Sequence, residues 1–319
     1  MEADHAARCR HEPTRIYTDT PTGARVVAGG EVVLEQPCNV LLHWATSTLE
    51  NPPAEGILSV RWAYRGQRCF ESAGTRFAVD DESYLVFNLG RTFSSTIRSR
   101  VPVECYTVCF QPGQAEEVLR GLVTPDDRLL DEPRGGSGAS LEFLETAYRH
   151  DDLVTPALRR LEAMRECPGA TFGWFEEQFR GLLVLLLHAH RGVCRRVESM
   201  PASRPSTRAE LCRRLHRARD FMEASLTEPV TIPVIADHAW FSPHHFLRLF
   251  KRAFGETPHQ YLTRRRIERA RRLLLVTDLS VTEVCFAVGF QSLGSFSWLF
   301  RGKVGVSPEA YRALGGRPA

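Results

Sequence analysis

The chain has 319 residues, of which 43% are hydrophobic and 25% charged, a composition typical of about two folded globular domains and unlike that of a disordered chain. No stretch approaches about eighteen uninterrupted apolar residues, and no basic segment followed by an apolar run opens the chain, so the sequence favours a cytoplasmic protein without a membrane partner. The formal net charge of +3 is uneven: residues 206–319 carry +8 and residues 1–205 carry −5, so a polyanionic partner suits only the C-terminal part.

The first 135 residues are β-rich. Short Val, Ile, Leu, Phe and Tyr segments alternate with Gly, Pro, Asn and Asp clusters, at the spacing expected of a sandwich or barrel. The predicted strands are 25–34, 39–46, 57–64, 67–71, 75–79, 84–89 and 101–110. A small barrel either fills its interior with side chains or encloses a ligand.

Some polar and aromatic side chains of these strands are candidates for a ligand pocket, although an ordinary core or surface position is the stronger alternative for each of them. They are His43, Trp44, Trp62, Tyr64, Tyr84, Asn88 and Tyr106. Alternation places Tyr84 and Asn88 on one face of a strand without saying which face is inside. His43 has no neighbouring His and Glu set, so we expect no metal, no cofactor and no catalytic residue.

The nine cysteines form no Cys-x-x-Cys pair and have no zinc-finger spacing to His, so reduced thiols are expected. Cys105 and Cys109 would share one face of a strand but lie about 13 Å apart, beyond the reach of a disulfide. A thiol-based sensor is therefore kept only as an alternative.

Gly135-Gly136-Ser137-Gly138 ends the β-rich part, and helices are predicted at about 140–150, 153–166 and 171–197. The last is apolar nearly all round, which indicates burial on more than one side. One side of this helix can pack on the β-rich part, and another side can pair with the same helix of a second protomer. A homodimer is therefore expected. The Pro- and Ser-rich stretch 199–206 is the predicted linker between domains 1–198 and 207–319.

The last third of the chain repeats one pattern about fifty residues apart. Phe246, Phe250, Gly255, Pro258 and Tyr261 correspond to Phe296, Phe300, Gly305, Pro308 and Tyr311. Each copy reads as a short helix, a tight turn, a second helix, and a Gly-x-[Thr/Ser]-Pro motif that ends this helix and caps the next. The pattern predicts a duplicated helix-turn-helix unit.

Caps and turns can be assigned within each copy. Trp240-Phe241 and Gly289-Phe290 form the turns, Ser242 caps the second helix of the first copy, and Ser280 with Glu283 forms a capping box in the second. Between the copies, Pro258 to about Thr277 reads as one long helix, about 27 Å in length. Such a connector can hold two helices near successive major grooves, which lie about 34 Å apart.

The run Ile232 to Arg312 closely resembles the AraC/XylS-type transcriptional regulators. The motifs are Leu249-Phe250-Lys251, Gly255-x-Thr-Pro258, Arg266-Ile267-x-x-Ala270, Val288-Gly289-Phe290 and Gly305-Val-Ser-Pro308-x-x-Tyr311-Arg312. The resemblance implies two helix-turn-helix subdomains that bind adjacent major grooves of double-stranded DNA. The DNA-binding residues expected from it and from the outward helix faces are His244, Leu247, Arg248, Lys251, Leu293, Gly294, Ser297, Trp298, Arg264 and Arg301.

Two residues depart from the family pattern, and a third matches it without an obvious DNA role. The family usually has Arg where this chain has Trp298 and a small residue, often Gly, where it has Trp240. We therefore expect the second copy to bind mainly through apolar and phosphate contacts. Arg264 is expected to contact phosphate, whereas Arg266 is expected to form a structural ion pair.

The N-terminal region resembles, in architecture, the family's sensing and oligomerising domain, a cupin-like barrel followed by helices. The expected fold is therefore α+β, and the expected partners are DNA, a small-molecule effector, a second protomer and, as a candidate, RNA polymerase. One alternative is a DNA-binding regulator whose N-terminal domain only dimerises. Another is a cupin-type oxygenase, which the absence of a metal-ligand set in the sequence disfavours.

Overall fold

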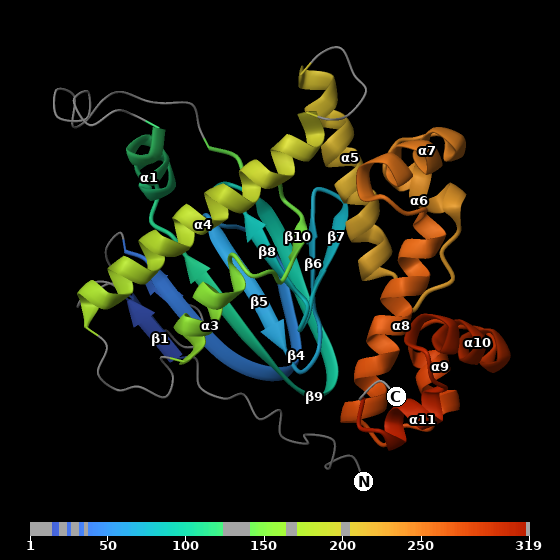
Figure 1. Cartoon of the computed structure of the whole chain (residues 1–319). Coiled ribbons are helices and arrows are strands. Elements are labelled where there is room, and N and C mark those ends of the chain that lie inside the picture. The colour runs from blue at the N-terminus through green and yellow to red at the C-terminus, as the bar shows by residue number, and fades with distance from the viewer. Residues whose placement is uncertain are drawn as a thin grey trace, which may run out of the picture. The chain divides into compact units, whose positions relative to one another are not determined.

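The structure, a computed structural model, has an antiparallel β-sheet in its first part and helices in its last part (Figure 1). It describes residues 15–18, 24–26, 32–34, 38–123, 141–163, 171–198 and 205–316. The chain divides into two compact units, Met1–Arg196 and Val197–Ala319. Residues 199–204 of the predicted linker lie outside the described residues, and Pro205 already begins a helix. None of the helices described is long and apolar enough to cross a membrane.

Two long strands dominate the sheet of the first unit, β4 (Val40–Glu55) and β9 (Thr92–Cys109). The strand order is β1-β4-β9-β5-β8-β10, with β1 (Arg15–Thr18), β5 (Ser59–Tyr64), β8 (Ser83–Phe87) and β10 (Ala147–Arg149). β6 (Arg68–Ser72) pairs with β9 and with β7 (Thr75–Val79), while β2 (Ala24–Val26) and β3 (Val32–Leu34) form a separate antiparallel pair. The predicted strand at 25–34 is therefore two strands.

The predicted strands 39–46 and 101–110 are confirmed but are parts of longer strands. β4 continues through Pro52 and Pro53, where the register with β9 shifts between Asn51 and Ala54. Proline donates no ladder hydrogen bond, so it is accommodated at such an irregularity.

The helix predicted at about 140–150 is wrong, because residues 147–149 form β10 against β8. The Asn88 side chain explains the extended path: its amide donates to the carbonyl of Phe143 (2.9 Å) and its oxygen accepts from the amide of Phe143 (2.8 Å). Pairing with an otherwise open sheet edge outweighs local helix propensity. A helix that the sequence pattern did not predict, α1 (Gln114–Val123), follows β9.

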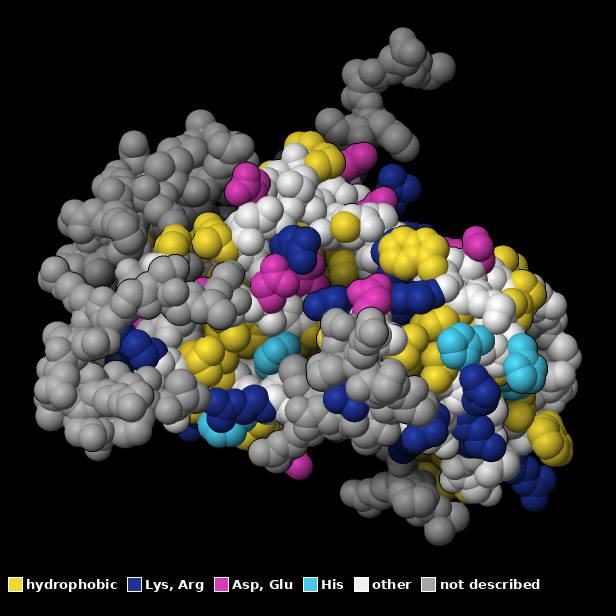
Figure 2. Space-filling model, turned by 90° about the horizontal axis from the view of Figure 1, so that it is seen from above, with side chains coloured by type: hydrophobic (Ala, Val, Ile, Leu, Met, Phe, Trp, Pro, Cys, Tyr) yellow, Lys and Arg dark blue, Asp and Glu magenta, His cyan; other side chains and the backbone are white. Residues whose placement is uncertain are grey.

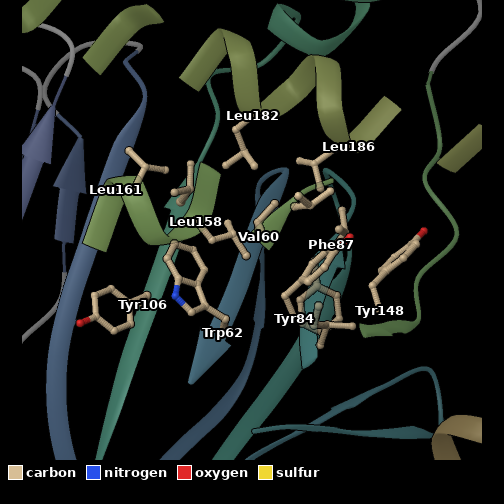
Figure 3. Packing of buried hydrophobic residues seen from close by; sticks show 14 of the residues in the cluster. Val60, Trp62, Tyr84, Phe87, Tyr106, Tyr148, Leu158, Leu161, Leu182 and Leu186 are labelled. Carbon is tan, nitrogen blue, oxygen red and sulfur yellow. The ribbon is translucent and has the colours of Figure 1, made fainter. Parts of the chain in front are cut away.

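Helices α3 (Thr155–Ala163) and α4 (Phe172–Glu198) cover one face of the sheet (Figures 1 and 3). In Figure 3, Leu158 and Leu161 of α3 and Leu182 and Leu186 of α4 point toward the strands. The apolar stripe of α4 is buried within its own unit; its buried residues are Phe175, Phe179, Leu182, Leu183, Leu186 and Leu187. The exposed side chains of α4 include the polar Glu176, Glu177, Arg180, His188 and Arg191 and also Phe172, which is 48% exposed.

The second unit is helical throughout. It contains α5 (Pro205–Ala224), α6 (Ile232–His238), α7 (Pro243–Phe254), α8 (Pro258–Val276), α9 (Val281–Ala287), α10 (Leu293–Val304) and α11 (Pro308–Ala313). One core joins α5, α6, α7 and the start of α8, and another joins the rest of α8 to α9, α10 and α11. The long helix predicted from Pro258 is confirmed, and it belongs to both cores.

Most of the caps at the ends of these helices agree with the sequence prediction. Gly255 and Gly305 end α7 and α10 in the left-handed region, with φ of 79° and 92°. The capping box of Ser280 and Glu283 is present, as predicted. Ser242 occupies the cap position of α7 but makes no side-chain capping hydrogen bond.

Candidate nucleic-acid interface

The outer face of α7 offers free cationic groups. Its inner face buries Phe246, Leu249 and Phe250, which leaves a set of exposed side chains on the other side: His244, Leu247, Arg248 and Lys251. Among the described residues, no acceptor holds the side chain of Arg248 or Lys251. These cations are therefore available to phosphate oxygens or base edges.

The corresponding face of α10 is mostly apolar. Trp298 is 76% exposed and Leu293 is 39% exposed, and Gly294 adds no side chain between them. Ser297 is half-buried, whereas Arg301 is exposed near the end of the helix. The face thus offers apolar surface and one terminal cation.

Arg264 of the connecting helix α8 is already paired. Its guanidinium bonds Glu256 at 2.7 Å and Glu268 at 2.9 Å. Burial opposes the charged form, but the hydrogen bonds that Arg264 donates to these two carboxylates outweigh it and raise the pKa of Arg264. This pairing argues against the predicted phosphate contact, because two carboxylates already neutralise the side chain.

Arg266 does not form the expected ion pair. Its guanidinium instead donates to the carbonyl oxygens of Leu226 (2.8 Å) and Glu228 (3.0 Å), after the end of α5. In the second half of the unit, Arg312 similarly donates to the carbonyl of Leu274 (3.1 Å) and to that of Leu279. Both arginines are structural, since they bind backbone carbonyls at or just beyond the ends of α5 and α8.

The turn of the second helix pair packs tightly against the first half of the unit. A Cβ atom at Gly289 would lie 2.5 Å from the carbonyl oxygen of Leu226 and 3.2 Å from Nε of Arg266. Its φ of 89° is also in the left-handed region. Trp240, which occupies the same place in the first pair, has a φ of 54° and is 63% exposed.

A buried charge network that the sequence pattern did not identify joins α5 to α8. Arg265, 4% exposed, bonds Glu223 of α5 and Glu268 of its own helix, each at 2.6 Å. The hydroxyl of Tyr261 also donates to Glu223. Part of the basic excess of this unit is therefore internal, whereas Arg248 and Lys251 are exposed on the outer face of α7. Figure 2 shows basic and histidine side chains beside apolar ones at its right, over this unit.

The residues predicted for a ligand pocket in the first unit fall on different faces of the sheet. His43, Trp62 and Tyr106 pack together on the side that α3 and α4 cover; the rings of Trp62 and Tyr106 stack at 5.2 Å and those of His43 and Tyr106 lie 4.6 Å apart. Tyr84 lies on the same side, stacked on Tyr148 (Figure 3). These side chains form the interface between sheet and helices.

The remaining candidates have other places. Tyr64 and Trp62 donate to Glu162 of α3, at 2.8 and 2.7 Å. Burial raises the pKa of the Glu162 carboxyl, although both hydrogen bonds oppose this shift. Asn88 is fully engaged with the backbone of Phe143, and Trp44 lies on the opposite face of the sheet from Trp62, since Trp44 pairs with Cys105 in the register.

The described residues contain no group of three or more His, Cys, Asp or Glu side chains able to hold a metal ion. None of the six described cysteines forms a disulfide.

The two helix pairs, their long connector and the exposed outer faces of α7 and α10 define a helix-turn-helix protein. A family model described as a helix-turn-helix domain matches residues 235–314. The HTH-type transcriptional activator AarP of Providencia stuartii is 33% identical over 92 residues, which cover 29% of this chain and 68% of AarP. The chain belongs to the AraC/XylS-type family of transcriptional regulators.

Two further matches each cover about a third of this chain. The HTH-type transcriptional regulator ArgR of Pseudomonas aeruginosa is 35% identical over 99 residues, 31% of this chain and 30% of ArgR. An AraC-type transcriptional regulator structure from Chromobacterium violaceum is 34% identical and covers 33% of this chain and 95% of that one, with a TM-score of 0.31. The chain thus spans about a third of the length of the first relatives it matches.

Proposed function

We propose that this protein is a cytoplasmic transcriptional regulator that binds double-stranded DNA sequence-specifically. In this proposal the pairs α6–α7 and α9–α10 are two helix-turn-helix subdomains, and α7 and α10 enter successive major grooves. The observation that carries the proposal is the face of α7, where exposed Arg248 and Lys251 have no protein acceptor among the described residues while the opposite face is buried. RNA polymerase remains a candidate partner.

The two reading helices, α7 and α10, are proposed to differ in chemistry. Arginine makes bidentate hydrogen bonds to guanine in the major groove, so Arg248 is assigned a base contact and Lys251 a phosphate contact. The apolar face of Leu293 and Trp298 suits thymine methyl groups and the sugar backbone, with Arg301 at phosphate. Arg264 is left out of this assignment because Glu256 and Glu268 already hold it.

The N-terminal unit is proposed to be a cupin-like barrel that binds a small-molecule effector. The curled antiparallel sheet with helices on one face supports this assignment. Dimerisation of two protomers with α4 in the interface is part of this proposal: Phe172 of α4 is 48% exposed and Val184 and Leu185 are only partly buried, although most of the apolar stripe is buried within its own unit.

The test is selection of duplexes from a random DNA pool by the full chain, followed by titration of the selected duplex and a scrambled one. We expect the selected duplex to bind at least about a thousandfold more tightly at physiological salt, the low end for specific recognition. The footprint should span two major grooves on one face of the duplex. No enrichment of any sequence, or equal affinity for both duplexes, would contradict the proposal.

A further inference from the structure

The face of the sheet that α3 and α4 do not cover carries two arginines. Arg61 of β5 lies beside Thr107 of β9 in the register, and it alternates with Val60 and Trp62, which face the helices. Arg68 of β6 is 3% exposed, whereas Arg61 is half-buried. Their guanidinium carbons lie 4.6 Å (Arg68) and 5.8 Å (Arg61) from the centroid of the same ring, Phe70, so the two charges are neighbours.

Neither arginine has an acidic partner among the described residues. Arg68 donates one hydrogen bond, to Oγ of Ser95 at 2.9 Å, and its Nε and Nη1 atoms are buried without an acceptor. Within the part of the chain that the structure describes, Arg61 donates to Oγ of Ser59 alone, at 3.3 Å. Uncompensated buried charge is costly, so such a pair calls for an anion.

The neighbouring thiols do not supply that anion. Burial raises the pKa of Cys105 to about 11, although Arg68 and Arg61 act in the opposite direction. Burial lowers the pKa of Arg68 to about 9, and repulsion from Arg61 adds to this shift. At neutral pH the thiol is therefore uncharged and the guanidinium is charged.

The surroundings of the pair are aromatic. Arg68 lies 5.0 Å from the ring centroid of Trp44, and Arg61 lies 4.5 Å from that of Phe93. Stacking engages the flat faces of the guanidiniums and leaves their N–H edges free for an acceptor. The hydroxyl of Thr107, in the same row as Arg61, is also buried without a partner among the described residues.

We propose that this face of the sheet binds a small organic carboxylate. Its carboxylate accepts hydrogen bonds from Arg61, Arg68 and Thr107, and its apolar part lies against Trp44, Phe70 and Phe93. The proposal rests on the proposed function only in calling this ligand the effector, and it names the effector's chemical class. The aromatic surroundings favour an organic carboxylate over an inorganic anion, which has no apolar part to bury.

The first experiment measures the melting temperature of the full chain with benzoate and with hexanoate, each against its neutral amide and against inorganic phosphate at the same ionic strength. We expect at least one carboxylate to raise the melting temperature, while the matched amide and phosphate leave it unchanged. No shift with either carboxylate, or an equal shift with the amide, would overturn the proposal. An equal shift with phosphate would mean a general anion site and would also overturn it.

Variants locate the effect. Arg68→Met should abolish the shift caused by the carboxylate, and it should not lower the melting temperature of the ligand-free protein, because it removes an uncompensated buried charge. Should Arg68→Met fail to fold, Arg61→Met at the half-buried position is the second variant and should lose the shift likewise. Arg65→Met is the matched control, since Arg65 is exposed and pairs with Glu104 at 3.1 Å, and it should keep the full shift.

A shift that survives both Arg61→Met and Arg68→Met would place the ligand elsewhere and contradict the proposal. Titration of the selected DNA duplex with the same preparations separates the two claims. DNA binding without a carboxylate shift refutes the ligand assignment alone, and a carboxylate shift without DNA binding refutes the proposed function alone.

Discussion

Arg248 combines charge, exposure and position on the outer face of α7, and the described residues offer it no competing acceptor. We expect Arg248→Ala to weaken binding to the selected duplex by about 1–3 kcal/mol and to relax the preference at one base pair. Titrations on selected and scrambled duplexes at one salt concentration measure both effects. Arg213→Ala is the control, because this exposed arginine of α5 pairs with Glu210, and it should bind like the wild type. Equal losses of affinity for both duplexes would mean that Arg248 contacts phosphate and no base.

Trp240 occupies a turn position where the family usually has a small residue, and it adopts a backbone conformation that is unfavourable for a residue with a side chain. Its φ of 54° disfavours any side chain, while its ring stacks on Arg217 at 4.3 Å. Trp240→Ala loses the stacking and keeps the strain, whereas Trp240→Gly loses the stacking and relieves the strain. We expect the glycine variant to be more stable than the alanine variant by about 1 kcal/mol. Urea unfolding measures the difference, and equal stabilities would show that the turn carries no strain.

At the scale of elements, the close approach at Gly289 fixes the second helix pair against the segment after α5. Gly289→Ala adds a steric clash with the carbonyl of Leu226 to the cost of a positive φ. Gly255→Ala is the matched control, because Gly255 has a similar φ of 79° but a Cβ atom added there would meet no other atom within 4 Å. We expect Gly289→Ala to lose about 1–3 kcal/mol more than Gly255→Ala, the usual cost of overpacking. Equal losses of unfolding free energy in the two variants would mean that the segment after α5 moves aside without cost.

The two reading helices should differ in how strictly they select sequence. Leu293, Gly294 and Trp298 offer few hydrogen-bonding groups, whereas His244 and Arg248 offer several. We therefore expect the half-site under α10 to tolerate base substitutions better than the half-site under α7. Titration of a systematically substituted duplex tests this, with hydroxyl-radical footprints to assign each half. Equal intolerance in both halves would contradict the asymmetry.

Local signals explain which elements were predictable. The helices α7 to α10 are determined by signals that lie close together in the sequence: Gly255, Gly305, the Ser280 capping box and the spacing of the Phe residues. The helices of the second unit could therefore be predicted well. The helix expected at about 140–150 failed because Phe143 is held by Asn88, which is 55 residues away in the chain. The pairing of Arg264 with Glu256 and Glu268 depends on the fold around the start of α8, which charge counting does not reveal.

The ligand-pocket prediction stays a prediction, and the sequence could not place its residues on one face of the sheet for a related reason. Alternation along a strand separates two faces, but only the register with neighbouring strands and the position of α3 and α4 decides which face is covered. Trp62, Tyr84 and Tyr106 proved to be on the helix-covered face, and Arg61 and Arg68 on the other. The available signal was a single arginine, Arg61, within a strand whose other residues are mostly apolar.

At the scale of the whole molecule, the boundary of the DNA-binding unit can be tested by truncation. The matching family model begins at residue 235, yet α5 supplies Leu215, Ala218 and Met222 to the first core, each fully buried. Loss of the buried side chains of Leu215 and Met222 alone removes roughly 3–6 kcal/mol of stabilising free energy, which is comparable to the free energy of unfolding of a small domain. We therefore expect a fragment of residues 205–319 to fold alone and a fragment of residues 225–319 to fail.

The longer fragment should be a monomer that binds the selected duplex with the same base preferences as the full chain, because both reading helices share the connector α8. Light scattering, urea unfolding and DNA titration on the two fragments and on the full chain measure size, cooperativity and affinity. If the full chain is a dimer, it should bind paired sites more tightly than the fragment, through effective concentration, without a change in base preference. A cooperative unfolding transition in residues 225–319 would contradict the role given to α5, and altered base preferences in residues 205–319 would mean that the N-terminal unit takes part in reading the DNA.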